Sequence, residues 1–381
     1  MNRDVNRLCS ALQSEPLRAR GLTSRKAPEV SIDPAGTIKI TSTKNWLTVQ
    51  PKPLNYIFEG NLVAGSIGYI TGVGGTGKST FMICFVFSLC TGGEIFETFR
   101  PARPFRVLYC CAEDNEDIVR MRFYYTAQQE VEHDRARMQK AIDENLILFC
   151  NQPLPLLKLK NGSIEHDAGL KELQQIVKRE RPDIVILDPK SCFYGDLDEN
   201  SNSHNSAFID CLKTVTALGC TVIFTHHEGK ARASSGSQFS SRGGQALSDG
   251  ARWQITLSHI EEKEAGKLKV DTKSIVKVTQ VKSNYTTFFN PFYLQRDANG
   301  ALSRVDFAEQ REARTLNAVK QVLHSGITCK PRDLDREAGR KFADSVIDIT
   351  GQSKRETTGI VKALIKAEKL QTDTEGHISE L

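Results

Sequence analysis

The sequence lacks any apolar run long enough to cross a membrane. A helix needs ~20 consecutive apolar residues to span a bilayer, and the longest apolar run, residues 81–90, falls far short of that length. The N-terminal sequence MNRDVNRLCSALQSE also lacks the apolar stretch of an export signal. We therefore expect a cytoplasmic protein with no membrane partner.

Cysteine pairs with metal-ligand spacing are also missing. The chain has ten cysteines but no C-x2-C pair and no Cys/His cluster. This pattern argues against a zinc site and against a disulfide framework. Cys110 and Cys111 are neighbours inside an apolar run, and we expect them to be buried, reduced thiols.

The composition lacks the bias of collagenous, low-complexity or disordered chains. Of the 381 residues, 39% are hydrophobic and 25% are charged, which is close to the average of globular proteins. The length allows two or three domains with packed cores. The formal net charge of +5 permits a polyanionic partner without requiring one.

The sequence changes character near residue 51. Residues 1–50 are polar, with eight Lys or Arg against four Asp or Glu between positions 3 and 44, and we expect a flexible basic arm. Residues 51–308 alternate short β-branched runs with amphipathic segments of helix length. This alternation predicts an α/β domain whose mostly parallel sheet is covered on both faces. The expected strands are residues 66–71, 106–111, 146–150, 183–187 and 220–225.

Two further patterns follow residue 250. Residues 252–259, 274–282 and 288–305 have the character of strands with no helix between them, and a turn at 297–300 predicts a hairpin at the edge of the sheet. Residues 312–381 predict a small domain of three helices and a terminal strand, similar to a winged helix. Between positions 314 and 371 it has twelve Lys or Arg against seven Asp or Glu. Both DNA and an initiator or other replication protein stay open as its partner.

The strongest motif is Gly-Val-Gly-Gly-Thr-Gly-Lys-Ser at residues 72–79, which fits the phosphate-loop pattern G-x4-G-K-[ST]. It follows the strand-like IGYIT and opens the helix-like STFMICFVFSLC, which is the required context. Backbone N–H groups and the helix N-terminus bind phosphates in such a loop, while the lysine reaches the β- and γ-phosphates and the hydroxyl ligates Mg²⁺. We predict ATP and Mg²⁺ as cofactors. The expected nucleotide contacts are Gly72, Val73, Gly74, Gly75, Thr76, Gly77, Lys78, Ser79 and Thr80.

Two carboxylates follow predicted strands. Asp188 ends the run IVILD and could hold the Mg²⁺ ion, or could simply cap the turn after the strand. Glu113 follows LYCCA and could orient or deprotonate the attacking water. Glu113 could also be a solvated loop acid or a helix cap, and Asp114 is the competitor for its role.

Tandem histidines end another predicted strand, in the segment FTHHEGK. Either His226 or His227 could hydrogen-bond the γ-phosphate and sense its loss. A metal pair is disfavoured because adjacent strand residues point to opposite faces. The chain lacks an N-K-x-D segment after the phosphate loop, which disfavours a GTPase.

The order of these motifs resembles one ATPase family. A phosphate loop, a strand-tip glutamate, a strand-tip aspartate, then THHEGK and SRGGQALSDGARW is similar to the RecA-like ATPases of the plasmid-encoded RepA type. Members of that family are ring-forming, hexameric replicative helicases related to the DnaB ring. The resemblance extends over about residues 45–300.

This resemblance implies roles for individual residues. Glu113 would be the catalytic glutamate, Ser79 and Asp188 would contact Mg²⁺, and His226 or His227 would sense the γ-phosphate. The remaining two are basic: Arg252 in GARW would be a trans-acting arginine finger, and Lys282 a second basic residue that reaches a neighbour's nucleotide.

Both basic assignments have alternatives. Related rings carry Arg two positions after the lysine, where this chain has Asn284. Arg252 could instead pair with Asp249 on its own surface. A finger from the next subunit would supply cationic charge to the transferring phosphoryl group and couple hydrolysis to the ring.

Two loops are candidates for holding single-stranded DNA. Residues 228–245, EGKARASSGSQFSSRGGQ, combine small residues with Lys230, Arg232 and Arg242, which suits sequence-independent phosphate contacts. The same composition also describes a plain surface loop. The loop 190–204 carries Phe193 and Tyr194 but has an acidic tip, which argues against it as the main grip.

These patterns predict a RecA-like, ATP-hydrolysing ring helicase, expected to be hexameric, that acts on single-stranded DNA in plasmid, phage or integrative-element replication. Two alternatives stay open. One is a recombinase-like or mobile-element ATPase that binds DNA without unwinding it, and the other is a DNA-binding regulator switched by nucleotide. The intact set of Lys78, Glu113 and Asp188 favours turnover over a switch.

Overall fold

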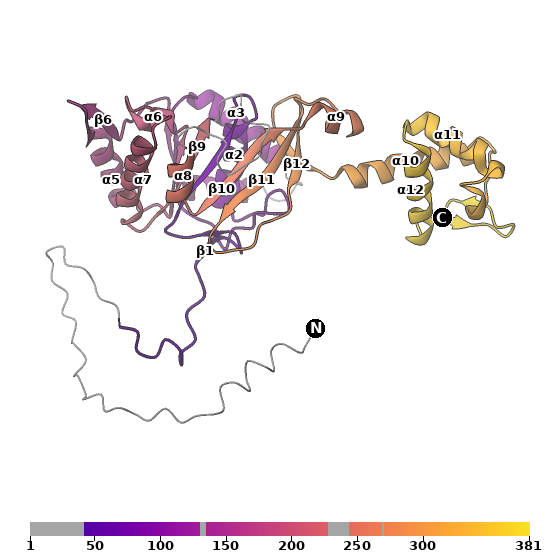
Figure 1. Ribbon diagram of the computed structural model, residues 1–381, viewed down its shortest axis with the longest axis horizontal. Coiled ribbons are helices and arrows are strands. Elements are labelled where there is room, and N and C mark those ends of the chain that lie inside the picture. The colour runs from indigo at the N-terminus through magenta and orange to yellow at the C-terminus, as the bar shows by residue number, and fades with distance from the viewer. Residues whose placement is uncertain (1–41, 130–134, 228–243, 269) are drawn as a thin grey trace. The chain divides into compact units, whose positions relative to one another are not determined.

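The structure is a computed structural model, and it describes residues 42–129, 135–227, 244–268 and 270–381. The chain divides into two units, Met1–Pro53 and Leu54–Leu381 (Figure 1). Most of the predicted basic arm lies outside the described residues. Its described end, residues 42–53, consists of turns and extended chain in which Trp46, Leu47 and Val49 are exposed.

A nine-stranded sheet forms the framework of the second unit, in the order β13-β12-β11-β10-β3-β9-β8-β4-β5. The six strands from β10 to β5 are parallel, and β11, β12 and β13 extend the sheet antiparallel. This mixed α/β architecture confirms the predicted fold class. The strands are β3 (Ile67–Gly72), β4 (Val107–Cys111), β5 (Leu146–Cys150), β8 (Ile184–Asp188), β9 (Thr221–His227), β10 (Trp253–His259), β11 (Ile275–Ser283), β12 (Phe292–Arg296) and β13 (Leu302–Val305).

Helices cover both faces of the sheet because its central strands are apolar on both sides. In β8, Ile184 and Ile186 face one core cluster, while Val185 and Leu187 face the other. The first cluster contains side chains of α2 (Lys78–Thr91) and α3 (Glu116–Gln129), with Ile142 of α4 (Arg135–Asn145) packed against it. The second contains side chains of α5 (Ala168–Glu180), α6 (Ser191–Tyr194), α7 (Asn202–Thr216) and α8 (Gly244–Gly250).

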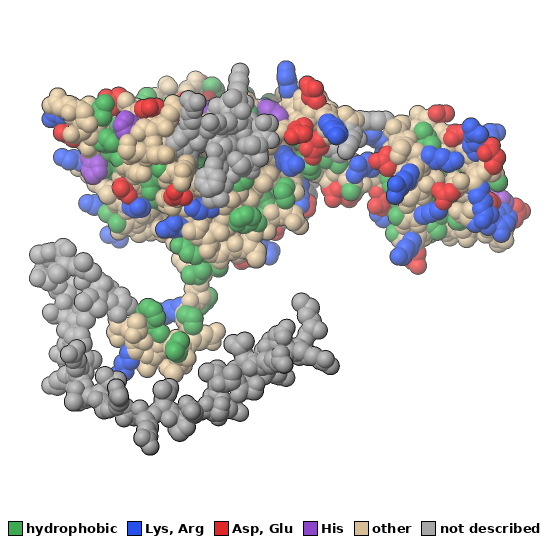
Figure 2. All heavy atoms as spheres, in the orientation of Figure 1, with side chains coloured by type: hydrophobic (Ala, Val, Ile, Leu, Met, Phe, Trp, Pro, Cys, Tyr) green, Lys and Arg blue, Asp and Glu red, His purple; other side chains and the backbone are tan. Residues whose placement is uncertain are grey.

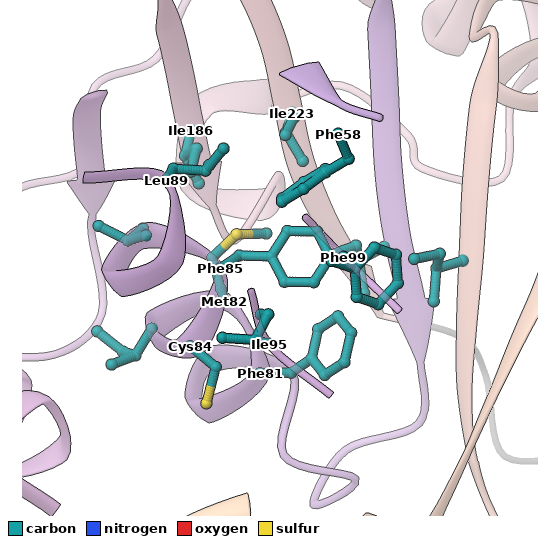
Figure 3. Packing of buried hydrophobic residues seen from close by; sticks show 14 of the residues in the cluster. Phe58, Phe81, Met82, Cys84, Phe85, Leu89, Ile95, Phe99, Ile186 and Ile223 are labelled. Carbon is teal, nitrogen blue, oxygen red and sulfur yellow. The ribbon is translucent and has the colours of Figure 1, made fainter. Parts of the chain in front are cut away.

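Phe58, Phe81, Phe85 and Phe99 pack together in the first cluster, around the phosphate-loop helix α2 (Figure 3). The ring of Phe85 lies 4.9 Å from that of Phe58 and 4.7 Å from that of Phe99, and 4.8 Å from that of Phe81. All four side chains are fully buried. Tilted and edge-on contacts of this kind add to the free energy gained by burial, so they anchor α2 and the loop before it.

The structure corrects two predictions about the connections. A short helix, α9 (Glu262–Leu268), lies between β10 and β11, where no intervening helix was expected. The predicted loop 190–204 is partly helical, because α6 occupies its start and α7 begins at Asn202. Phe193 and Tyr194 are buried in the second cluster.

Two hairpins also add to the framework. One pairs β1 (Tyr56–Phe58) with β2 (Leu62–Val63). The other pairs β6 (Leu157–Lys160) with β7 (Ser163–His166) through a turn at Asn161 and Gly162, where φ is 51° and 78°. Both central residues of that turn have the positive φ of the common two-residue hairpin turn.

Cysteines take the places expected of structural thiols. Cys110 and Cys111 are buried, free thiols on adjacent positions of β4. Burial raises the pKa of both to about 12, so they stay protonated near neutral pH.

The C-terminal segment has its own apolar core, which includes Val319, Phe342, Val361 and Leu364. Asp306 caps the first helix, and a reciprocal capping box joins Ser353 to Glu356 at the start of the last. The elements are α10 (Phe307–His324), two short 3-10 helices, η2 (Pro331–Asp333) and η3 (Glu337–Gly339), α11 (Arg340–Thr350), α12 (Lys354–Lys366), and the antiparallel pair β14 (Gln371–Thr372) and β15 (Ile378–Ser379). Within the described ranges, no helix has the length and apolar character of a membrane span.

The Phe85 ring should be a principal support of the first apolar cluster. Phe85→Ala removes a fully buried ring and should lower the free energy of unfolding by about 3–5 kcal/mol. Phe288→Ala, at a position where the ring is 56% exposed, should change it by no more than about 0.5 kcal/mol. Denaturant unfolding monitored by circular dichroism would measure both, and equal effects would contradict the packing described above.

Candidate nucleotide site

The phosphate loop connects the central strand β3 to α2. Gly75 and Gly77 have φ of 86° and 89°, a conformation that glycine adopts without strain. The loop is closed by hydrogen bonds from the Thr76 amide and hydroxyl to the Val73 carbonyl, the latter at 2.9 Å. These contacts direct the turn so that α2 begins at Lys78 with its N-terminus at the loop.

Lys78 is held inside this turn. Its side chain is largely buried, and its Nζ donates to the carbonyl oxygens of Gly72 at 2.8 Å and Val73 at 3.0 Å. The ammonium group therefore lies at the carboxyl end of β3, where parallel-sheet proteins bind ligands.

Asp188 is buried at the tip of β8 and accepts hydrogen bonds from three hydroxyl groups. Thr225 Oγ1 lies 2.5 Å from its Oδ1 and the Tyr109 hydroxyl 3.0 Å from its Oδ2, and the Ser79 hydroxyl is the third donor. Burial raises the pKa of the Asp188 carboxyl, and the hydrogen bonds from Thr225, Tyr109 and Ser79 oppose that shift. Burial thus outweighs the three hydrogen bonds.

The oxygen atoms around Asp188 fit the group that the motif implies. Mg²⁺ prefers oxygen ligands and commonly binds through one or two protein oxygens plus phosphates. The Asp188 carboxylate and the Ser79 hydroxyl already lie together at the foot of the phosphate loop. These two residues would hold the ion, and the bound ion would neutralise charge on the phosphate oxygens.

Glu113 and Asp114 take different positions after β4. Glu113 is exposed and lines a cavity of about 370 Å³ together with Lys78 and His227. Asp114 forms an ion pair with Arg122 of α3. Glu113 is therefore the carboxylate that faces the space beside the phosphate loop.

The two histidines at the end of β9 separate onto different sides. His227 is exposed and lines the same cavity as Lys78. His226 is buried, and burial, with help from Lys190, His227 and Lys78, lowers its pKa to about 3. His226 is therefore neutral near neutral pH, and His227 is the imidazole that shares the cavity with Lys78.

Arg252 lies far from this group. Its backbone N–H donates to the Ile67 carbonyl at 2.8 Å, so it sits beside the first residue of β3, whereas the phosphate loop follows the last. The parallel register pairs Leu257, five residues on, with Gly72, and strand geometry makes that separation about 16 Å. The guanidinium is exposed and donates to the Asp249 backbone carbonyl at 3.3 Å.

Lys282 accompanies Arg252 at that end of the sheet. It pairs with Gln254 across β10 and β11, and its ammonium donates to the Ser248 carbonyl. Burial lowers the pKa of Lys282, Asp249 opposes the shift and Arg252 adds to it. The structure thus groups the two predicted basic residues with each other and apart from Lys78.

Some of the residues predicted from the sequence are not described by the structure, and one residue of the cavity was not predicted. The predicted DNA contacts Lys230, Arg232 and Arg242 lie outside the described residues. Sequence reasoning missed Arg296 at the end of β12, which lines the cavity and donates from Nη2 to the Gly75 carbonyl at 3.1 Å. The residues around Arg296 in the sequence give no sign of this contact. Arg296 reaches the phosphate loop only because β12 pairs with β11 in the sheet.

One known protein family matches the part of the chain that holds the phosphate loop, Glu113 and Asp188. Residues 34–233, just over half of the chain, match the family described as AAA domain, and the chain belongs to that family. It is therefore a P-loop ATPase, a class that binds nucleotide, typically with Mg²⁺. Among solved structures it is similar to a KaiC-like protein from the hyperthermophilic archaeon Pyrococcus horikoshii OT3, with 15% identity, a TM-score of 0.45, and coverage of 67% of this chain and 100% of that one.

The pH dependence of the free energy of unfolding should reveal the burial of His226. The folded protein lowers the pKa of His226 from 6.5 to about 3, so the unfolded chain binds more protons between those values. The free energy of unfolding should therefore fall as the pH drops through this window. His226→Gln should weaken that dependence by up to about 1.4 kcal/mol per pH unit.

Urea unfolding at pH 4, 5, 6 and 7 would measure this slope. His166→Gln is the matched control, because His166 is exposed on β7. A His226→Gln protein with the same slope as the His166→Gln protein would show that His226 binds protons equally in both states.

Proposed function

We propose that this protein is an ATP-driven ring motor of the RepA helicase type, which translocates on single-stranded DNA during replication of a plasmid, phage or integrative element. The observation that carries the proposal is the placement of Arg252. An exposed guanidinium, with Lys282 beside it, lies about a strand length from its own phosphate loop. Arg252 therefore cannot act on its own nucleotide, but can act on that of a neighbouring copy.

A site completed by a neighbour calls for a particular kind of assembly. In such an assembly, the end of the sheet that carries Arg252 contacts the phosphate-loop end of the next subunit. The subunits therefore associate head to tail. Such contacts generate rings when the rotation closes. We propose a closed ring, with six subunits as the expected number, in which each phosphate loop faces the Arg252 of the next chain.

The chemistry at each phosphate loop follows from the side chains that line it. Lys78 would contact the β- and γ-phosphates, and Ser79 and Asp188 would hold Mg²⁺, which lowers the charge on the phosphates when bound. Glu113 would orient the attacking water and accept its proton as the new P–O bond forms and the bond to ADP breaks. Arg252 of the neighbour would stabilise the charge on the transferring phosphoryl group.

DNA contacts are proposed at two places. Residues 228–243 directly follow His227 in the sequence. A movement of His227 when the γ-phosphate is lost would therefore act directly on the segment that carries Lys230 and Arg232. In the C-terminal segment, Lys354, Arg355 and Lys366 are exposed on α12. Lys and Arg alternate there with Asp and Glu over the visible face (Figure 2), which supports either DNA or a replication protein as the partner.

An unwinding assay tests the motor directly. The wild-type protein should hydrolyse ATP faster with single-stranded DNA and should separate a tailed duplex. Glu113→Gln should retain ATP binding but lose hydrolysis and unwinding by 100-fold or more, because it keeps the shape of the side chain and removes the base. Glu116→Gln, a neighbouring exposed acid on α3, should leave both activities near wild type.

Each possible result identifies one of the functions considered. Hydrolysis stimulated by DNA without strand separation would contradict the helicase and favour a recombinase-like ATPase. Tight, sequence-specific duplex binding with slow turnover would instead favour a regulator. Near-normal hydrolysis by Glu113→Gln would contradict the assignment of the base.

Mixing two inactive variants tests the shared site. Lys78→Ala and Arg252→Ala damage different halves, so a mixed interface can pair an intact phosphate loop with an intact arginine. The mixture should regain a measurable fraction of wild-type ATPase activity. Lys78→Ala mixed with Glu113→Gln is the matched control and should stay inactive, because both changes damage the same half. Stable mixed assemblies without recovery would show that Arg252 does not act across the interface.

A further inference from the structure

The hairpin of β12 and β13 forms one wall of the nucleotide cavity. Asn299, Gly300 and Ala301 from its turn line the cavity, as does Arg296 from the end of β12. Tyr125 of α3 also lines this cavity. The hairpin is therefore part of the site, although it lies more than 200 residues from the phosphate loop in the sequence.

The Arg296 guanidinium lies against the phosphate loop itself. Its Nη2 donates to the Gly75 carbonyl at 3.1 Å, and a Cβ atom added at Gly77 would lie 2.4 Å from the same nitrogen. The backbone N–H of Arg296 donates to the Ser274 carbonyl at 2.8 Å, which fixes the strand end. The side chain thus reaches the loop from a rigid element.

This guanidinium has more donor capacity than partners. Its Nε is buried without a hydrogen-bond partner, and no carboxylate among the described residues forms an ion pair with it. The adjacent Asp297 carboxylate is engaged in the turn, where it accepts the N–H groups of Asn299 and Ala301 at 2.9 Å each. Burying an unsatisfied donor on a cation costs free energy, so the position suits an anion that arrives from outside.

We propose that Arg296 is a phosphate ligand of the nucleotide in its own subunit, a second cation beside Lys78. Guanidinium groups bind phosphates through paired N–H donors, and both groups line one cavity. On nucleotide binding, the guanidinium exchanges part of its contact with the Gly75 carbonyl for phosphate oxygens. This inference rests on nucleotide binding at the proposed site but not on DNA unwinding.

Nucleotide affinity tests the proposal with the full chain. Arg296→Gln keeps a polar side chain and removes the charge, Arg296→Lys retains the charge, and Lys273→Ala removes an exposed cation next to Ser274 and outside the cavity. Calorimetric titration with MgATP and MgADP would give affinities, and thermal melting without nucleotide would report the fold.

We expect Arg296→Gln to weaken MgATP binding by about tenfold to a hundredfold relative to Lys273→Ala. Arg296→Lys should recover part of the loss of affinity. In the absence of nucleotide, the Arg296→Gln and Lys273→Ala proteins should have the same melting temperature. The dependence of MgATP affinity on salt should also become shallower in Arg296→Gln, because a screened charge contact is gone. If Arg296 only supported the fold of the loop, its substitution would not change the salt dependence of MgATP affinity.

Two results would overturn the inference. One is MgATP affinity of Arg296→Gln within twofold of that of Lys273→Ala, and the other is a loss that Arg296→Lys does not reduce at all. Either result, with a wild-type protein that binds ATP and unwinds DNA, removes the role of Arg296 and leaves the proposed function intact. A wild-type protein that binds ATP but does not unwind DNA removes the helicase function and leaves Arg296 as a nucleotide ligand.

Discussion

The buried carboxylate of Asp188 is the constraint around which the nucleotide site is built. Hydroxyl groups from β4, β9 and α2 converge on it, through Tyr109, Thr225 and Ser79. Each hydrogen bond to a charged group stabilises by about 1.5–3 kcal/mol, yet burial still raises its pKa. Burial therefore disfavours the charged form of Asp188, which is the form that a metal ion would need. The apolar clusters on both faces of the sheet offset this local cost and hold the strand tips in place.

The same rigid sheet holds the residues of the proposed catalytic site in two groups, one at each end of its strands. Lys78, Glu113 and His227 lie around the carboxyl ends of the parallel strands, while Arg252 and Lys282 lie at the other end of β10. Because a sheet with two covered faces bends little, neither group can approach the other within one chain. The division supports a motor whose catalytic unit is the boundary between two subunits.

Much of this arrangement could be predicted from the sequence. The five apolar runs became β3, β4, β5, β8 and β9, because continuous β-branched segments have few alternatives to a buried parallel strand. The helix α9 was missed since EKEAGKL is short, polar and without clear periodicity. The β6–β7 hairpin had a readable signal in Asn161-Gly162 between alternating residues. Arg296 had none, because its place depends on the pairing of strands remote from the phosphate loop.

The glycines of the phosphate loop differ in what they tolerate, and this bears on how the motif can drift during evolution. A Cβ atom at Gly72 would lie 2.4 Å from the Leu257 carbonyl of β10, whereas one at Gly74 would meet nothing within 4 Å among the described residues other than its two chain neighbours. Substitution at Gly72 therefore disturbs the packing of two strands whether or not nucleotide is present. Selection on that glycine acts through the sheet as well as through phosphate binding, and neutral variation should enter the motif first at position 74.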